Sequence, residues 1–136
     1  MEDRELIKLA LEARKNAYSP YSGCKVGAAL LTADGIVYTG CNIENASYGL
    51  TVCAERTAFF KALSDGHKDF EIIAVTGGRE EKPETYFYPC GACRQIMSEF
   101  CGADFKIITA VSEEDYTVNS LNELLPFSFG REDITD

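Results

Sequence analysis

The sequence lacks a long uninterrupted run of apolar residues, and it contains few basic residues and only one histidine. A membrane-spanning helix needs about 20 consecutive, mostly apolar residues, so none is predicted. The charged start at residues 1–5 is followed by an amphipathic segment, unlike a signal peptide. We therefore expect a cytoplasmic protein with no membrane partner.

The shortage of basic residues disfavours a nucleic-acid partner. The 13 Lys and Arg residues stand against 22 Asp and Glu, which gives a formal net charge of -9. Affinity for nucleic acids comes largely from Lys and Arg side chains that neutralise phosphates. We expect a small substrate that is not highly phosphorylated. The single histidine, His67, lies in a polar turn over residues 65–69, so we assign it no ligand role.

The 136 residues predict one domain, 1–136, because no repeat, linker or low-complexity segment interrupts them. The apolar spacing predicts a first helix that ends before Ser19. Two β-rich runs, 25–33 and 36–43, flank Asp34-Gly35 and predict an antiparallel hairpin. Further helices are predicted over about 53–63, 90–100 and 120–125, and strands over 71–76, 106–111 and 116–118. We interpret residues 70–118 as strand-helix-strand-helix-strand. The fold class is therefore α/β, a three-layer α-β-α sandwich with a mixed five-stranded sheet.

Six cysteines are present, but a disulfide framework is typical of short secreted chains, so we expect reduced thiols. Three of them lie in two short motifs, Cys53-Ala54-Glu55 and Pro89-Cys90-Gly91-Ala92-Cys93. Three thiolates suit Zn²⁺ and leave its fourth tetrahedral position for water. A carboxylate that is not a ligand can then move the proton of that water. The pattern predicts a hydrolytic zinc site with these three cysteines as ligands and Glu55 as proton carrier.

The helices expected after Cys53 and Cys90 favour metal binding at both residues. Unsatisfied N–H groups and the positive end of the helix dipole lower the pKa of a thiol at a helix start. Three thiolates on Zn²⁺ leave a local charge of about -1, which weakens the metal as a Lewis acid. Arg56 shares a helical face with Cys53, and we predict that it hydrogen-bonds the sulfurs and offsets this charge.

A structural zinc site with four cysteines would need one more ligand. Cys101 lies too far along the same helix as Cys93 to share an ion with it. Cys24 and Cys41 flank the hairpin strands without ligand-pair spacing, so we expect both to be small buried hydrophobes.

Two other interpretations of the motif residues stay open: a redox-active cysteine pair, and a glutamate that is merely exposed to solvent. Cys90-x-x-Cys93 would suit a thioredoxin-like redox pair, although that chemistry needs neither Cys53 nor Glu55. One tightly bound zinc per chain would exclude it. Glu55 could instead be a solvated carboxylate in the first turn of a helix, where acidic residues are common.

The two motifs resemble the His-or-Cys-x-Glu and Pro-Cys-x-x-Cys elements of zinc deaminases. The sequence is similar to the small homotetrameric cytidine deaminases over nearly its whole length. Besides the two motifs, the resemblance rests on residues 17–22, 26–30 and 42–49 and on the Leu-Leu-Pro segment at 124–126. It implies a cytidine deaminase-like fold, Zn²⁺ as cofactor, and hydrolysis of cytidine and 2′-deoxycytidine to uridine and 2′-deoxyuridine with release of ammonia in pyrimidine salvage. Glu55 would pass a water proton to N3 of the cytosine ring and then protonate the departing amine.

The same resemblance implies roles for five more residues. Asn42 and Glu44 would bind the ribose hydroxyls, and the backbone N–H of Ala54 would hold the pyrimidine carbonyl. Tyr48 and Phe129 would reach the site of a neighbouring subunit, so that active sites are shared within a homotetramer. The preference between ribose and deoxyribose stays open, because both sugars carry a 3′-hydroxyl.

The sequence departs from the family pattern at two positions. Cys24 replaces a phenylalanine that usually packs on the base, and Tyr88 replaces a small residue before Pro89. Both changes leave open a deaminase of another free heterocycle or modified nucleoside. A zinc-stabilised interaction module without turnover also stays open. Deaminases of tRNA or single-stranded DNA need a cationic groove, which the charge balance disfavours.

Overall fold

The computed structural model describes residues 1–79 and 81–135. Its sheet has five strands in the order β2-β1-β3-β4-β5, of which β3 and β4 pair in parallel and the other neighbours are antiparallel. The strands are β1 (Lys25–Thr32), β2 (Val37–Cys41), β3 (Phe70–Gly78), β4 (Lys106–Ala110) and β5 (Tyr116–Ser120). The α-helices are α1 (Asp3–Ala13), α2 (Ala54–Ser64), α3 (Gly91–Phe100) and α4 (Leu121–Leu124), and three 3-10 helices are η1 (Arg14–Asn16), η2 (Tyr48–Leu50) and η3 (Arg131–Asp133).

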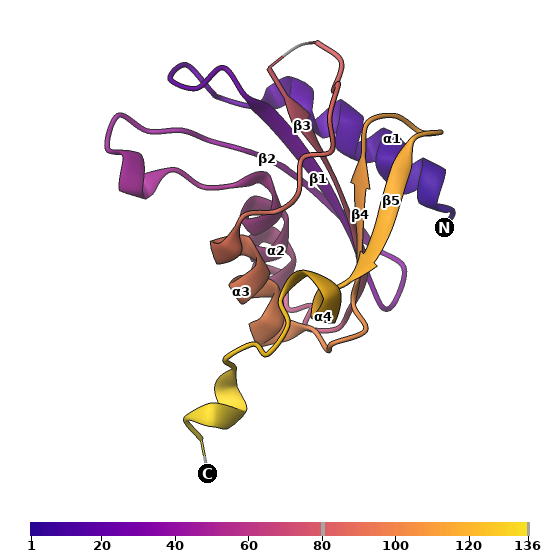
Figure 1. Cartoon of the computed structure of the whole chain (residues 1–136), viewed down its shortest axis with the longest axis vertical. Helices are drawn as coiled ribbons and strands as arrows, with labels where there is room; N and C mark the ends of the chain where they lie inside the picture. The colour runs from indigo at the N-terminus through magenta and orange to yellow at the C-terminus, as the bar shows by residue number, and fades with distance from the viewer. Residues whose placement is uncertain (80, 136) are drawn as a thin grey trace.

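The helices cover both faces of the sheet, as Figure 1 shows, with α1 on one face and α2 and α3 on the other. One buried cluster joins Leu6 and Ile7 of α1 to Ile72 and Ile108 in the sheet. A second and larger cluster joins the residues of α2 and α3 to the opposite face of the same strands. Residues alternate between the faces along a strand, so β1 and β3 are apolar at nearly every position. The predicted three-layer sandwich is confirmed.

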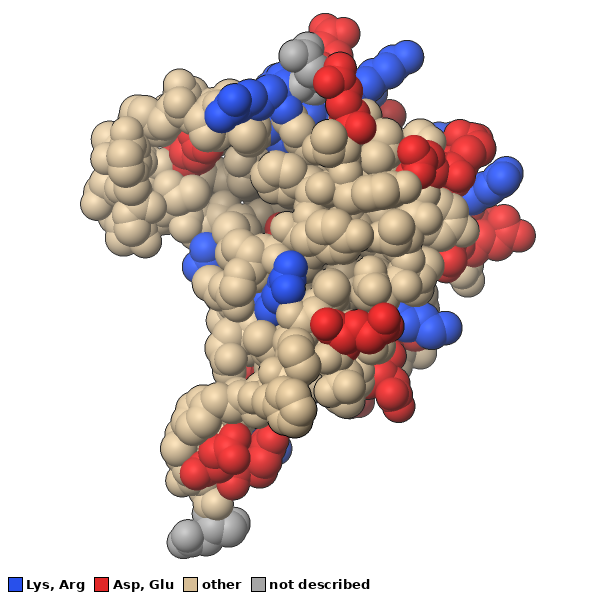
Figure 2. Space-filling view, viewed as in Figure 1, with Lys and Arg blue, Asp and Glu red and all other residues tan. Residues whose placement is uncertain are grey.

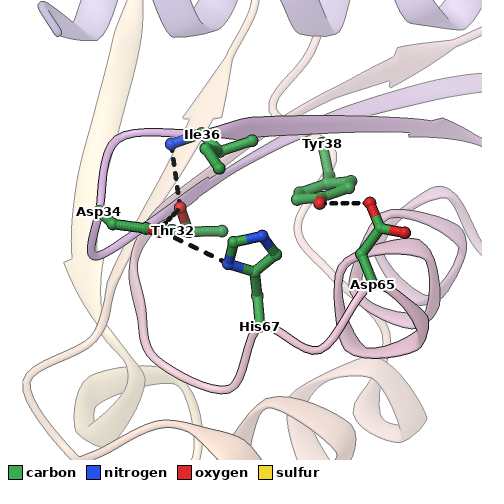
Figure 3. A network of polar contacts seen from close by, with 6 residues as sticks. All are labelled: Thr32, Asp34, Ile36, Tyr38, Asp65 and His67. Carbon is green, nitrogen blue, oxygen red and sulfur yellow. Dashed lines mark hydrogen bonds and ion pairs between the residues drawn. The ribbon is translucent and has the colours of Figure 1, made fainter.

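The predicted hairpin is also confirmed, because β1 and β2 pair in antiparallel register around Asp34-Gly35. Gly35 has a positive φ of 90°, a conformation that favours glycine. The Thr32 hydroxyl donates to Asp34 Oδ1 at 2.6 Å and accepts from the Ile36 N–H at 2.9 Å. These contacts close the turn (Figure 3).

His67 belongs to the surroundings of this hairpin rather than to the cysteine motifs. Its ring lies 5.5 Å from the ring of Tyr38, and its Nδ1 lies 3.6 Å from Asp34 Oδ1 (Figure 3). Tyr38 also donates to Asp65 Oδ2 at 2.6 Å. The contacts join the hairpin to the end of α2.

The second half of the chain differs from the prediction in one element. The described residues of the stretch 70–118 form a single α-helix, α3, and β4 leads to β5 without one. Residues 111–115 form a tight turn instead, in which the N–H groups of Val111 and Ser112 both donate to the Asp115 carbonyl. Five residues can connect antiparallel neighbours, but they are too few for a helical crossover. The predicted short helix does form after β5 as α4, where Ser120 and Glu123 cap it reciprocally.

Among the described residues, no helix combines the length and the apolar character needed to cross a lipid bilayer.

Candidate metal centre and active site

Two helix starts bring the cysteine motifs together. Cys53 is the N-cap residue of α2, Cys90 is the N-cap residue of α3, and Cys93 lies in the first turn of α3. The two helices lie on the same face of the sheet (Figure 1), where Cys53 and Cys93 pack at the edge of the larger core cluster. Pro89 precedes the second N-cap. Because proline has no backbone N–H to donate, α3 does not extend backwards through this residue. The helix starts predicted at both motifs are confirmed.

The three sulfur atoms form one group. Cys53 Sγ lies 3.6 Å from Cys90 Sγ, which lies 3.2 Å from Cys93 Sγ, and all three are within 4.8 Å of one another. A tetrahedral zinc ion with Zn–S bonds of about 2.3 Å requires sulfur separations of about 3.8 Å. The trio therefore fits a zinc ion with small adjustments.

The described part of the chain supplies no fourth His, Cys, Asp or Glu ligand to this group. Cys101 follows the end of α3, and burial raises its pKa to about 12. Cys101 is excluded by position, because the sulfurs that lie within reach of one another are those of Cys53, Cys90 and Cys93. The donor set is that of a zinc site with an open position, as in catalytic sites, rather than that of a closed structural site.

Cys53 ionises more readily than Cys93. Hydrogen bonds from the Cys93 thiol and from Arg56 lower the pKa of Cys53 to about 5, although burial opposes them. The pKa of Cys93 is raised, because Cys93 donates to Cys53 and is buried. The predicted fall in the pKa of Cys53 therefore occurs, and hydrogen bonds are its main cause.

Arg56 lies where a positive charge would offset the thiolates. Its Nη2 donates to Cys53 Sγ at 3.4 Å and reaches the Thr51 carbonyl oxygen at 3.5 Å. Residues at positions i and i+3 share one face of a helix, which places the guanidinium beside the sulfur. Arg56 thus points toward the cysteine group, as the sequence pattern suggested.

Glu55 is buried beside the cysteines, with only 4% of its surface exposed. Burial raises the pKa of its carboxyl group to about 7. The alternative of a solvated carboxylate in the first helical turn is therefore wrong for this residue. A carboxyl group with a pKa near neutrality both accepts and releases a proton under physiological conditions, which suits a general acid and base.

A cavity of about 400 Å³ opens at this point of the molecule. Eight residues singled out from the sequence line it, and they come from four segments of the chain: Cys24, Asn42, Glu44, Cys53, Ala54, Glu55, Tyr88 and Cys90. Two larger hollows of about 680 Å³ each lie elsewhere and contain none of the three cysteines. The smaller cavity is the candidate active site, because it joins the metal-binding group to the buried carboxyl.

Asn42 and Glu44 organise the rim of this cavity. Asn42 accepts from the Val26 N–H at 2.9 Å and donates through Nδ2 to the Cys24 carbonyl at 2.8 Å. Glu44 Oε1 accepts from the N–H groups of Tyr21 and Ser22 at 3.0 and 3.1 Å, and its Oε2 accepts from the Ser22 hydroxyl. The Ser22 hydroxyl is the main reason that the pKa of Glu44 is lowered. Each side chain keeps capacity for one more hydrogen bond.

Tyr48 and Phe129 do not line the cavity of their own chain. Tyr48 is 74% exposed, and its ring meets that of Tyr21 edge-on at 5.9 Å. Phe129 is 59% exposed on a tail that extends away from the body in Figure 1. The Gln95 side chain donates to the Phe129 carbonyl at 2.8 Å and anchors the tail beside α3.

Both departures from the family pattern lie in the cavity wall. Cys24 is half-buried there, and Tyr88 lies close to Cys90 in the chain with 42% of its surface exposed. The expectation that Cys24 and Cys41 are fully buried is wrong, because both are half-buried. Cys24 is reached from the cavity, and Cys41 lies at the end of the edge strand β2.

Sequence reasoning missed four lining residues, namely Ser22, Val26, Thr51 and Phe87. Phe87 is the most informative of them, because its ring packs directly against Gly77 at the end of β3. The sequence signal that could have identified Phe87 as a lining residue was its position just before Tyr88-Pro89-Cys90. The contact with Gly77 joins segments distant in the sequence, so no local pattern reveals it.

Comparison with known proteins agrees with this geometry. Residues 1–109 match the family described as the cytidine and deoxycytidylate deaminase zinc-binding region. The chain is 51% identical over 136 residues to a cytidine deaminase from Halalkalibacterium halodurans, with 100% of both chains covered. It is 45% identical over 135 residues to a cytidine deaminase from Sporosarcina psychrophila, which covers 99% of this chain and 96% of that one.

A solved structure shows the same fold. A crystal structure of the cytidine deaminase from Burkholderia pseudomallei superimposes with a TM-score of 0.87 at 47% sequence identity. The match covers 95% of this chain and 100% of the other, so the three-layer architecture and the placement of the helices are common to both.

Proposed function

The chain belongs to the cytidine and deoxycytidylate deaminase family, and we propose that it hydrolyses cytidine and 2′-deoxycytidine to uridine and 2′-deoxyuridine, releasing ammonia. The observation that carries this proposal is the buried Glu55 carboxyl beside three cysteine sulfurs in one cavity. Cys53, Cys90 and Cys93 would hold zinc, which lowers the pKa of water and so supplies a nucleophile at neutral pH.

Glu55 is the proton carrier in this proposal. Water adds through its oxygen to C4 of the cytosine ring, while the Glu55 carboxylate takes the water proton and delivers it to N3. Glu55 then transfers the remaining hydroxyl proton to the amino group, the C4–N4 bond breaks, and ammonia leaves a ring with a carbonyl at C4. A carboxyl with a pKa of about 7 suits both directions of transfer.

The rim of the cavity would bind the nucleoside. Ala54 is the first residue of α2, where backbone N–H groups lack helical partners, so its N–H can donate to the pyrimidine carbonyl. Glu44 and Asn42 retain one acceptor and one donor for the ribose hydroxyls. Cys24 would contact the base.

Assembly into a homotetramer with shared active sites is part of the same proposal. A hollow of about 680 Å³ on the outer side of α2 is bordered by Ile43, Leu50, Val52 and Phe60, of which Leu50 is 66% exposed. Phe127 in the tail is fully exposed and has a φ of 54°, a conformation unusual for a bulky residue. Exposed apolar clusters of this kind favour contact with another chain. Tyr48 and Phe129 would complete a neighbouring subunit's site.

A cytoplasmic role in pyrimidine salvage suits the chain. All six cysteines are free thiols, which agrees with a reducing compartment. The face in Figure 2 shows Lys and Arg scattered among acidic and uncharged residues, without a continuous basic groove, which favours a nucleoside over a nucleic acid.

The experiment that tests this function is a comparison of substrates. Purified protein loaded with zinc is incubated with cytidine, 2′-deoxycytidine, free cytosine, adenosine and guanine, and ammonia is measured. We expect ammonia and the corresponding uridine from the first two only. Ammonia from another heterocycle alone would favour a deaminase with a different substrate. Absence of ammonia from every compound, with one zinc per chain, would support an interaction module without turnover.

A further inference from the structure

Arg14 is a buried cation behind the candidate active site, with only 3% of its surface exposed. It follows α1 directly, and among the described residues it donates to backbone carbonyl groups on three different segments. Its Nε donates to Lys25 O at 3.1 Å, its Nη2 donates to Gly78 O at 2.9 Å, and its Nη1 donates to Glu81 O. One rigid guanidinium therefore joins the start of β1, the end of β3 and the loop that follows β3.

The backbone of Arg14 is itself held tightly. A Cβ at Gly27 would lie 2.1 Å from the Ala10 carbonyl oxygen and 2.6 Å from the Arg14 nitrogen. Only a residue without a side chain lets the end of α1 approach β1 this closely. The guanidinium therefore extends from a fixed point of the fold.

The segments that Arg14 joins lead to two parts of the cavity wall. Lys25 lies between Cys24 and Val26, which both line the cavity. The loop that begins after Gly78 and includes Glu81 continues to Phe87 and Tyr88, which also line it, and then to α3 (Figure 1).

The two parts of the wall meet over Gly77. A Cβ at Gly77 would lie 2.9 Å from a ring carbon of Phe87 and 3.0 Å from Val26 Cγ2. Phe87 and Val26 thus both lie close against Gly77 near the end of β3, next to the Gly78 and Lys25 carbonyl groups that accept from Arg14.

We propose that Arg14 is a positioning residue that sets the separation of the 24–26 and 87–88 walls and thereby governs nucleoside binding. This inference rests on the proposed function. The contacts of Arg14 with Lys25, Gly78 and Glu81 do not involve the cysteine group or Glu55, which lie at the starts of α2 and α3. Its loss therefore widens or misaligns the walls and leaves the metal ligands in place.

The test measures KM, kcat, zinc content and melting temperature for Arg14→Met and Arg14→Lys with cytidine. For Arg14→Met we expect KM to rise by roughly ten- to a hundredfold, because displacements of about 1 Å in binding groups have effects of this size. Zinc stays near one per chain and kcat changes by less than about threefold, because the chemistry is untouched. Arg14→Lys gives a smaller rise in KM, since one ammonium cannot span three carbonyl groups.

Two control variants test whether the rise in KM in Arg14→Met comes from a displaced cavity wall rather than from the loss of a positive charge or of stability. Lys15→Met removes the neighbouring charge, which lies on the surface and pairs with Glu12 at 3.1 Å, and it leaves KM unchanged. Ile7→Val weakens the core beneath the same helix and lowers the melting temperature without raising KM. An equal rise in KM in Ile7→Val would overturn the proposal, as would an unchanged KM in Arg14→Met.

A variant with Arg14 intact keeps the test decisive if Arg14→Met does not fold. Gly77→Ala places a methyl group where the Phe87 ring lies, so it displaces the wall and raises KM with zinc retained. An unchanged KM in Gly77→Ala would show that the wall position does not govern binding. Wild-type turnover is measured in the same series. An inactive wild type contradicts the proposed function itself, whereas an active wild type with unaffected variants contradicts only the role of Arg14.

Discussion

The guanidinium of Arg56 lies one helical turn beyond Cys53 and donates through Nη2 to its sulfur at 3.4 Å. This contact places a fixed positive charge against a group of three sulfurs that would otherwise leave zinc with excess negative charge. Groups that hydrogen-bond metal ligands typically contribute about 10- to 100-fold to metal affinity or activity. We therefore propose that Arg56 supports the metal centre without binding the ion.

Replacing Arg56 by Ala is expected to lower turnover or zinc affinity by roughly 10- to 100-fold. Zinc retained during dialysis against a graded chelator measures the affinity, and ammonia release measures turnover. Arg56→Lys keeps the positive charge but loses the rigid fork of N–H donors. Its turnover and zinc affinity should therefore lie between those of the wild type and those of Arg56→Ala. Lys8→Met, on the exposed surface of α1, controls for the loss of one charge. If Arg56→Ala retains zinc and turnover like the wild type, the proposed role is wrong.

Removing the metal should expose two specific thiols. With zinc bound, Cys53 and Cys90 resist alkylation, and a chelator makes both reactive, because a free thiolate is the nucleophilic form. Cys93 is buried and its pKa is raised, so it stays slow in both states. Cys101 stays slow in both states at a pH of about 8, since burial raises its pKa to about 12 and leaves little thiolate. Peptide mass spectrometry after timed alkylation measures each site. Equal labelling of Cys53 and Cys90 with and without zinc would rule out this ligand set.

Glu44→Gln should weaken binding of the sugar. Its carboxylate is ionised at neutral pH, because the Ser22 hydroxyl bond lowers its pKa, and it has acceptor capacity left for a hydroxyl. We expect KM for cytidine to rise about tenfold, the loss typical of one hydrogen bond to a charged group. KM for 2′,3′-dideoxycytidine, which lacks both hydroxyls, should change little.

Glu114→Gln is the matched control for this substitution, because it makes the same change in an exposed turn. A similar rise in KM for both nucleosides in Glu44→Gln would show that Glu44 supports the loop at residues 21–22 rather than the ribose.

The tail tests the shared-site proposal. A chain that ends before Pro126 loses the exposed Phe127 and Phe129, and we expect a higher KM for cytidine and a smaller oligomer. A chain that ends after Gly130 keeps both phenylalanines and should behave like the full chain. Light scattering measures the size and steady-state kinetics measure KM. Unchanged size and KM in the shorter chain would remove the idea that subunits share sites.

The local patterns in the sequence were sufficient for most of the fold and for the metal-binding group. Cys90 and Cys93 lie within one helical turn, and Cys53 and Glu55 lie within another, so their spacing alone predicts that each pair lies close together. The β-rich run at 25–33 predicts β1, and Asp34-Gly35 predicts its turn. The helix expected before β5 was wrong because residues 111–115 are too few to form one.

The features that could not be predicted from the sequence depend on contacts between segments that are distant along the chain. The Phe87 contact with Gly77 and the three carbonyl groups held by Arg14 join α1, β1, β3 and the following loop, and no spacing rule relates these positions. The burial of Glu55 has the same origin. Its place in the first helical turn also allowed a solvated side chain, and the fold makes it one of the most buried charged residues described.

In the proposed mechanism Glu55 moves the proton while the three cysteines hold zinc, and a comparison of the wild type with Glu55→Gln separates these two roles. Glutamine preserves the shape of the side chain but cannot carry a proton. Bound zinc and ammonia release from cytidine are measured on the same samples. We expect about one zinc per chain in both proteins, because the cysteines are unchanged, and ammonia from the wild type only. Ammonia release by Glu55→Gln at the wild-type rate would contradict it.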